Sequence, residues 1–564
     1  MITMNKQNIK EVFFTNTEEE TIYASEEFKR IEQKFDGSCS QLVDIHVKDN
    51  VNIYYLKISL DDALKKINIF KEETIVHALE SNAFGMLLRA KRENLEYTVW
   101  LPVPPDAFLF DKNRRIATSS ESRFSYQWEI YPYLRLNLLQ PYRGDEVITI
   151  PYIVMEDPSW QFYNELKSLN NIESRLYLKA NYFVCEKPSD VWSYLINGSV
   201  YDPRSKKGID KRFKCQQCAF AWWSYFGFLH RETGKKVYDI LQDEVAYTIL
   251  LDMSNEGEWG HGFWSDDIET HARFHLDGAH LLISQYEKSH LPVWREAAER
   301  CMDFVAENLM EVLDDGNLWF LHDSLEINSN NLHGRFKSTL FGKTLGNTLC
   351  INTHVQALTV LHRLKDVTSK RIHYAEMFEK GARALRMVLD YQPGEVIYKL
   401  LFPWIIKNKT STKPVSVIDK LKNSMGTRIT EKIYYILMSR YFPRFVLPGG
   451  FIERDLTCTF FKDVYHIINL KDLLTLYQQE QFGWLRPYIK NGLEFTRKFI
   501  GRLNLTHVFA RDPHYIEYLD ILYLYDKLIE RIPLDEIESV ERNIYQQTGG
   551  FSLDYYASEL VRGH

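Results

Sequence analysis

Residues 269–289 read ETHARFHLDGAHLLISQYEKS, and residues 292–313 read PVWREAAERCMDFVAENLMEVL. Apolar side chains recur at helical spacing in both segments, and only a short break separates them. The second segment carries the larger share of charged residues. A mostly buried helix that is followed by a helix with one wet face predicts an αα-hairpin whose first helix lies inside.

Further pairs of helical segments repeat this pattern along the chain. In each pair the first segment is rich in aromatic residues, and most second segments carry more charge. Repeated αα-hairpins predict a solenoid or a closed toroid. We therefore predict an (α/α) toroid whose inner helices begin near Gln216, Glu269, Cys350, Phe461 and His514.

The segment before the helical pairs has a different character. Residues 41–155 contain short β-branched and aromatic runs such as NIYYLKISL and VITIPYIVM, separated by turn signals, which predict a mostly β domain, a sandwich or a small barrel. Residues 61–81 are expected to form one inserted helix, and residues 1–40 a polar arm. The predicted class is thus a multidomain α+β chain with a helical toroid over residues 156–564.

Composition limits the class of protein. The chain has 564 residues and a net charge of −7, which disfavours a general nucleic-acid binder. Its seven cysteines are scattered without a framework spacing, as is usual in a reducing compartment. The N-terminus lacks the apolar core of a signal peptide, and the longest apolar run, Ala219 to Leu229, is too short to span a bilayer. We expect a cytoplasmic protein.

Irregular loops rich in Gly and Trp precede several of the first helices. In a toroid these loops would meet at one mouth, where helix N-termini favour anions. The loop EGEWGHGFWSDD supplies Trp259 and Trp264 for stacking on a sugar, and Asp267 as a polar contact. An anionic saccharide is the partner that suits such a mouth.

Residues 257–305, together with NTHVQALTVLHRL and YAEMFEKGARAL, resemble the (α/α) toroid carbohydrate-active enzymes. A β domain before a C-terminal toroid is the order found in the glucuronyl C5-epimerases. The likeness covers roughly residues 215–550 in texture, together with the domain order. It implies a sugar substrate more strongly than it implies one particular reaction.

Asp267, His271 and His275 stand four residues apart on one helical stripe. They could supply a general base or bind a metal ion. The spacing suits two imidazoles on one metal, but the HExxH signature is absent. We expect no cofactor, with His271 and His275 as the candidate pair if a divalent metal binds; a hydrogen-bonded, partly buried pair is the plain alternative.

Asn352 and His354 begin a later inner helix in the segment CINTHVQAL. Polar residues at a helix start often serve as caps. The alternative is that both face the mouth, with His354 titrating near neutral pH.

Glu453, Arg454 and Asp455 follow a Gly-Gly turn. Arg454 is suited to bidentate binding of a substrate carboxylate, and Glu453 to acid–base chemistry. An ordinary charged loop is the plain alternative. The predicted catalytic residues are Glu269, His271, His354 and Glu453; the predicted substrate-binding residues are Trp259, Trp264, Asp267, Asn352 and Arg454.

Two classes of function follow. The first is an enzyme acting on a uronic-acid-containing saccharide, by C5 epimerisation or, with similar residues, as a lyase or a glycoside hydrolase. The second is a non-catalytic toroid scaffold in polysaccharide assembly. A cluster of titratable side chains that converge in space distinguishes the first class from the second.

Residues 398–444 are basic within an acidic chain. They contain ten Lys or Arg against two acids, a local charge of +8, beside apolar residues such as Trp404. Such a segment can lie on an anionic membrane surface or hold an anionic polymer. A solvated insertion is the plain alternative.

Overall fold

The structure is a computed structural model. It describes residues 19–24, 28–35, 39–48, 51–59, 66–68, 74–82, 85–92, 95–102, 108–111, 117–119, 126–130, 134–138, 146–155, 161–167, 178–180, 183–185, 216–260, 270–327, 338–400, 441–456, 463–480, 482–499 and 514–548. Contacts divide the chain into two units. Unit 1 comprises residues 1–176, 182–251 and 260–268, and unit 2 comprises residues 177–181, 252–259 and 269–564.

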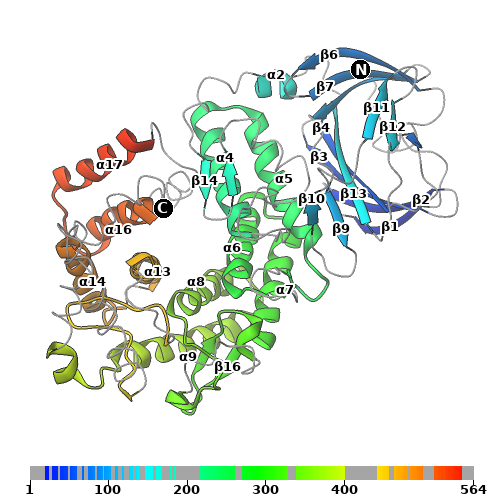
Figure 1. The fold of residues 1–564 in the computed structure, drawn as a ribbon. Coiled ribbons are helices and arrows are strands. Elements are labelled where there is room, and N and C mark those ends of the chain that lie inside the picture. The colour runs from blue at the N-terminus through cyan, green and yellow to red at the C-terminus, as the bar shows by residue number, and fades with distance from the viewer. Residues whose placement is uncertain are drawn as a thin grey trace, which may run out of the picture. The chain divides into compact units, whose positions relative to one another are not determined.

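Unit 1 contains an antiparallel sheet of ten strands with the order β1-β2-β3-β4-β13-β8-β7-β6, to which β9 and β10 add at β13 (Figure 1). A second sheet of three strands has the order β11-β12-β5. The mostly β prediction for this region is confirmed, while its finer form as a sandwich or a barrel stays a prediction. The strands are β1 (Glu19–Ala24), β2 (Phe28–Phe35), β3 (Cys39–Lys48), β4 (Val51–Ser59), β5 (Lys66–Asn68), β6 (Ile75–Asn82), β7 (Gly85–Arg92), β8 (Leu95–Pro102), β9 (Phe108–Asp111), β10 (Ala117–Ser119), β11 (Tyr126–Ile130), β12 (Leu134–Leu138) and β13 (Glu146–Met155).

Two details of the predicted β region were wrong. The helix expected over residues 61–81 is replaced by β5 and by β6, which pairs with β7 from Ile75 to Asn82. The arm expected over residues 1–40 instead supplies β1 and β2. In both places an antiparallel neighbour satisfies the backbone groups, so strands form although the side chains are largely polar.

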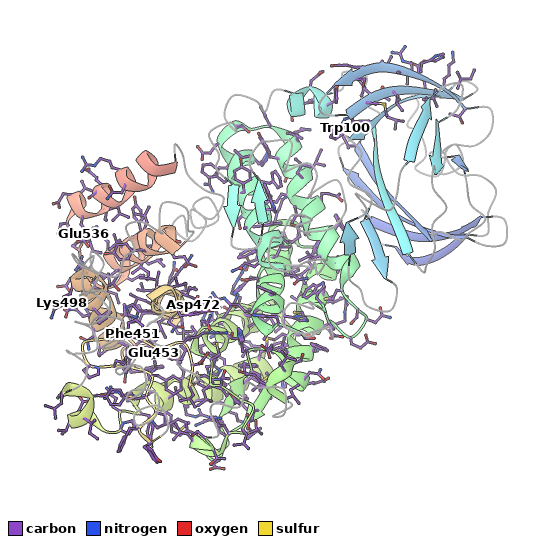
Figure 2. The ribbon with its side chains drawn as sticks, viewed as in Figure 1. Trp100, Phe451, Glu453, Asp472, Lys498 and Glu536 are labelled. Atoms are coloured by element: carbon purple, nitrogen blue, oxygen red, sulfur yellow. The ribbon has the colours of Figure 1, made fainter. Side chains whose placement is uncertain are left out.

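The first predicted hairpin belongs to unit 1. It consists of α4 (Gln216–Thr233) and α5 (Lys236–Asp252), which share a ring cluster: Phe226 stacks on Trp222 at 5.6 Å and on Tyr238 at 6.3 Å between centroids. A short helix, α2 (Gln161–Lys167), links this hairpin to the sheet. Its Glu165 accepts a hydrogen bond from the amide of Val237 in the first turn of α5. Its Tyr163 packs edge-on against Trp100 of β8, the residue labelled in Figure 2. The boundary between the two units therefore does not fall near residue 155, where the sequence predicted the end of the β domain.

Within the residues that the structure describes, unit 2 contains four αα-hairpins. They are α6 (Ala272–Ser289) with α7 (Pro292–Asn308), α8 (Ile351–Val367) with α9 (Arg371–Asp390), α13 (Asp463–Glu480) with α14 (Arg486–Phe499), and α16 (His514–Leu528) with α17 (Leu534–Thr548). The first helices contact one another in the order α6, α8, α13, α16, and each contacts its own second helix. The predicted starts of these four inner helices are confirmed to within three residues. Their closure into a full ring stays a prediction.

The remaining described elements are short. They are β14 (Leu178–Ala180), β15 (Phe183–Cys185), the hairpin of β16 (Met310–Val312) and β17 (Leu318–Phe320), and the 3-10 helices η3 (Ser324–Ile327) and η4 (Leu340–Gly342). The hairpin of β16 and β17 precedes the loop that leads to α8.

The same turn precedes three of the inner helices. In each turn an amide donates to the carbonyl four residues later, and a glycine three residues on donates back; the amides belong to Ser254, Leu313 and Leu447, and the glycines are Gly257, Gly316 and Gly450. All three glycines have positive φ, which L-residues rarely adopt. A Cβ on Gly257 or Gly450 would also lie within 2.3 Å of a carbonyl on the second helix of the hairpin.

Candidate functional site

Three buried histidines occupy the fourth position of α6, α8 and α13: His275, His354 and His466. Each accepts a hydrogen bond from an amide that closely follows the repeated turn. The donors are the amides of Trp259, Phe320 and Ile452, at 2.9, 3.2 and 3.0 Å. These histidines join each inner helix to the loop before it.

His354 does not fit the predicted catalytic role. Its Nδ1 accepts from the Phe320 amide, and its Nε2 donates to the carbonyl of Gly381 on α9 at 3.0 Å. The ring stacks on Trp319 at 3.9 Å and is fully buried. Burial lowers the pKa of His354 from 6.5 to about 4. Both nitrogens are thus committed to backbone groups, and the residue belongs to the core.

The predicted sugar-stacking role of Trp259 likewise finds no support in the structure. Its ring is buried and packs edge-on against His275, with 5.1 Å between centroids. A covered ring offers no face to a ligand. His275 is buried as well, and its Nε2 accepts from the Trp259 amide. Across the part of the chain that the structure describes, no group of three or more His, Cys, Asp or Glu could hold a metal ion.

A second polar cluster lies where α6 begins. His271 immediately precedes this helix, and its ring stacks on Phe274 at 4.2 Å. The same ring meets His322 edge-on, with 4.4 Å between centroids. The backbone fixes this pair, because the Ala272 amide donates to the His322 carbonyl at 3.0 Å and His271 forms a β-bridge with Asp323.

Arg454 completes this cluster from the loop before α13. Its Nη2 lies 2.6 Å from Nε2 of His322, and its guanidinium lies over the ring of Tyr465 at 4.6 Å. Asp455 adds a longer ion pair at 3.4 Å. The Arg454 side chain is 24% exposed, so this arginine is only partly buried. We name His271, His322, Arg454 and Tyr465 the arginine–histidine cluster.

Both imidazoles of the arginine–histidine cluster are neutral at physiological pH. Burial, together with the cations of Arg454 and Arg273, lowers the pKa of His271 from 6.5 to about 3. The same causes, with burial the largest, lower the pKa of His322 well below 6.5. An anion bound to Arg454 would offset that cation and raise both pKa values, so proton uptake by the imidazoles is coupled to binding of an anion.

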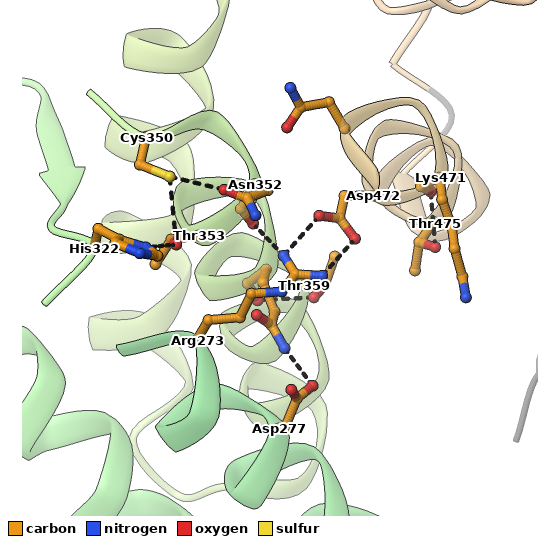
Figure 3. A network of polar contacts seen from close by, with 12 residues as sticks. Arg273, Asp277, His322, Cys350, Asn352, Thr353, Thr359, Lys471, Asp472 and Thr475 are labelled. Carbon is orange, nitrogen blue, oxygen red and sulfur yellow. Dashed lines mark hydrogen bonds and ion pairs between the residues drawn. The ribbon is translucent and has the colours of Figure 1, made fainter. Parts of the chain in front are cut away.

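The beginning of α8 lies against this cluster. Thr353 Oγ1 is 2.9 Å from Nδ1 of His322, and the Cys350 thiol donates to Oδ1 of Asn352 at 2.7 Å (Figure 3). The amide of Ile351 donates to the Arg454 carbonyl at 2.9 Å. The N-cap residue of α8, Cys350, makes no side-chain capping bond within the described residues. The capping interpretation of Asn352 therefore does not hold, because its side chain bonds to Cys350.

A further polar layer joins the three inner helices α6, α8 and α13. Arg273 donates to Asp472 at 2.8 Å and to the Asn352 carbonyl at 3.1 Å (Figure 3). Asp277 accepts from the side chain of Gln356 at 2.5 Å. Burial raises the pKa of Asp277 from 3.8 to about 7. Arg273 and Asp472 are each 15% exposed, so this layer is also partly accessible.

The structure brings together three of the predicted site residues. His271, Asn352 and Arg454 lie in or beside the arginine–histidine cluster. Glu453 is buried, and its backbone bonds to Phe445 and Asn469, so its catalytic role stays a prediction. Glu269, Trp264 and Asp267 lie outside the described residues.

Several members of the site were not predicted from the sequence: His322, Tyr465, Arg273, Asp277 and Asp472. A periodic signal was present for two of them. Arg273 and Asp277 are four residues apart on α6, as Asn352 and Gln356 are on α8. Polar residues at this spacing on helices predicted to be inner helices indicate a polar inner face.

Comparison with known proteins gives weak structural likenesses. No protein-family model matches the chain, and no curated protein matches it. A family 76 glycoside hydrolase from a bovine Bacteroides thetaiotaomicron strain has a TM-score of 0.32 at 10% identity over 93% of this chain and 99% of that one. A polysaccharide lyase has 0.27 at 10% over 95% and 84%. Cellobiose 2-epimerase from Bacillus thermoamylovorans has 0.28 at 10% over 60% and 87%.

Those TM-scores are too low to carry an argument about fold or activity. The fold class is defined by the elements of the chain themselves. A helical unit with repeated αα-hairpins stands next along the chain to an antiparallel β region. Among the described helices, none combines the length and the apolar character needed to cross a bilayer.

Proposed function

We propose that this protein is a carbohydrate-active enzyme that removes the C5 proton of a uronic acid unit in a saccharide, with C5 epimerisation as the reaction. The contact between Arg454 and His322 carries the proposal, because it places the guanidinium of a partly exposed arginine 2.6 Å from a neutral imidazole. A guanidinium binds a carboxylate with two parallel hydrogen bonds. A neutral imidazole accepts a proton from the carbon next to that carboxylate.

The first step couples binding to the release of a base. In the free protein, Nη2 of Arg454 donates to Nε2 of His322. A substrate carboxylate that accepts this donor leaves the lone pair of His322 Nε2 open. The carboxylate charge also raises the low pKa of the imidazole. The site therefore gains its base only when an acidic sugar is bound.

The second step moves one proton. His322 Nε2 takes the C5 proton, and the electron pair of the C–H bond passes into the carboxylate, which becomes a dianionic enediolate. Arg454 stabilises the added charge, as fixed donors do for oxyanions. Return of a proton to C5 from the opposite face gives the epimer. We assign that return to Tyr465, whose ring lies on the guanidinium of Arg454.

One observation favours a second reaction. His271 and His322 lie side by side, with 4.4 Å between ring centroids, so both imidazoles approach a bound sugar from one side. A β-elimination can use two groups on one face. One imidazole takes the C5 proton, the C4–O bond breaks, and the imidazolium so formed gives that proton to the leaving oxygen, directly or through the neighbouring imidazole. A polysaccharide lyase is the second candidate.

Incubation with glucuronic-acid polymers in D₂O distinguishes these outcomes. Deuterium at C5 with an unbroken chain supports the epimerase. A new absorbance of unsaturated uronate supports the lyase. Reducing ends alone indicate a hydrolase and contradict proton abstraction, and absence of all three across uronate polymers supports the scaffold alternative.

A further inference from the structure

A chain of hydrogen bonds runs along the start of α8. Arg454, the donor at one end, fixes the direction of each of these bonds. Arg454 has five N–H donors and no acceptor. Its Nη2 lies 2.6 Å from Nε2 of His322, so that nitrogen must carry the lone pair. The proton of the neutral imidazole then resides on Nδ1, which lies 2.9 Å from the Thr353 hydroxyl.

The direction continues through Thr353 and Cys350. Because the Thr353 oxygen accepts from His322, its own proton is free to donate to Sγ of Cys350 at 3.7 Å. The thiol in turn donates to Oδ1 of Asn352 at 2.7 Å. Burial raises the pKa of Cys350 from 9.0 to about 11, so the thiol keeps its proton at neutral pH.

These residues stand where helix caps are usual, but they bond elsewhere. Within the described residues, the cap position of α8 has no side-chain capping bond. Thr353 reaches instead to His322, which is 31 residues earlier in the chain, and Cys350 reaches to Asn352. The amide of His322 is held separately, by the carboxylate of Glu326 at 2.8 Å. The backbone and the ring of His322 are thus fixed by different partners.

We propose that Thr353 and Cys350 are positioning residues. Arg454 sets the Nδ1–H tautomer of His322, Thr353 accepts that proton and so holds the ring with its Nε2 lone pair toward Arg454, and Cys350 holds the amide of Asn352 with Oδ1 turned toward the thiol. The catalytic meaning of this chain rests on the proposed function: a base that acts through Nε2 requires this tautomer. The tautomer itself does not depend on the substrate.

Nitrogen-15 NMR of the histidine-labelled full-length protein tests the tautomer directly. The His322 signal is assigned by its loss in His322→Gln. The expected result is a protonated Nδ1 for His322 and a protonated Nε2 for His354, which donates to a carbonyl and so serves as the internal reference. A protonated Nε2 on His322 would overturn the proposal.

Variants of Thr353 separate positioning from packing. Thr353→Val keeps the shape and removes the hydroxyl, and Thr353→Ser keeps the hydroxyl. Thr353→Val takes away the acceptor of the Nδ1 proton, so we expect it to shift the His322 nitrogen-15 signals and to lower kcat about tenfold or more, with KM little changed, while Thr353→Ser retains the wild-type signals and rate. His322 signals and a kcat that are both unchanged in folded Thr353→Val contradict the proposal. If Thr353→Val does not fold, the wild-type spectrum still decides.

Cys350 is tested in the same way. Cys350→Ser keeps a donor to Asn352, whereas Cys350→Ala removes it. We expect a several-fold larger KM for a uronate saccharide in Cys350→Ala than in Cys350→Ser; equal KM values would remove Cys350 from the proposal. Should no uronate be turned over, the proposed function fails, but the spectra still decide the tautomer.

Discussion

The histidines of unit 2 fall into two groups that differ in what their nitrogens meet. His354 and His466 bond to backbone on both sides, through an amide before the helix and a carbonyl on the second helix of the hairpin. His271 and His322 instead meet each other, and His322 meets Arg454 and Thr353. The first group joins elements of the fold, whereas the second group is arranged around a cation.

The difference follows from position along the chain. The fourth residue of an inner helix faces its partner helix and the preceding turn, so its ring is enclosed. His271 precedes the helix, and His322 lies in the loop after β17, where side chains face other loops. A buried, low-pKa histidine is therefore not by itself a sign of catalysis, because both groups have lowered pKa values.

The largest effect is expected at Arg454. Arg454→Gln removes the cation that binds the substrate carboxylate, and we expect kcat/KM to fall by roughly 10²–10³-fold, as for loss of one fixed donor to a developing oxyanion. Steady-state kinetics on the active uronate polymer measures it. Arg497→Gln, an exposed ion-pair partner on α14, is the control and should retain activity. Equal activity of the two variants would place the site elsewhere.

The next effect distinguishes the two histidine groups by stability. His354→Gln leaves the Phe320 amide and the Gly381 carbonyl without their partner, and we expect unfolding free energy to fall by about 2 kcal/mol. Urea denaturation measures it. The exposed His373→Gln on α9 should leave stability within about 0.5 kcal/mol of wild type. A His354→Gln variant that is stable but inactive would instead support the predicted catalytic role of His354.

The two groups of histidines also separate what could be predicted from the sequence from what could not. The starts of the inner helices were predictable because periodicity and aromatic content are local properties, as at Cys350 and His514. The role of His354 was not, because its partner amide lies 34 residues away across a turn. His322 was missed for the same reason: its meeting with Arg454 spans 132 residues.

A third effect concerns the pH dependence of stability. Asp277 has a pKa raised to about 7 by burial, and its Oδ2 has no partner among the described residues. A carboxyl whose pKa is raised in the folded state binds its proton more tightly there than when unfolded. Its contribution to stability is therefore complete below about pH 4 and is lost as pH rises toward and through 7.

Asp277→Asn removes this titration. We expect the stability of the variant relative to wild type to improve by roughly 2–3 kcal/mol between pH 5 and pH 8.5, since about two pH units of proton binding at about 1.4 kcal/mol each are lost over this range. Urea denaturation at both pH values measures the difference. Asp366→Asn, an exposed position on α8, is the control and should show no such trend. A difference between Asp277→Asn and wild type that does not vary with pH would mean that Asp277 is ionised throughout.

The smallest effect concerns the basic segment. The first and last residues of this segment, which the structure describes, contact each other. Arg444 lies over the ring of Tyr398 at 4.7 Å, and the Tyr398 hydroxyl donates to the Phe442 carbonyl. Residues 401–440 are beyond what the structure describes. We propose that the segment holds an anionic polymer or membrane surface.

Changing five of its lysines to Gln should weaken retention on a heparin-like column and sedimentation with anionic liposomes; the residues are Lys407, Lys409, Lys413, Lys420 and Lys422. The control changes five exposed lysines elsewhere: Lys91, Lys236, Lys288, Lys498 and Lys527. If the two variants behave alike in both assays, the segment is a plain solvated insertion.

Deuterium exchange at C5 of a uronate polymer, measured by NMR for wild type, His322→Gln and His354→Gln, tests the central claim most directly. Each variant is assayed at a temperature where circular dichroism shows it folded. Wild type and His354→Gln should exchange at similar rates, and His322→Gln should be slower by about 10²-fold or more. Exchange at the wild-type rate in His322→Gln would contradict the assignment of the base.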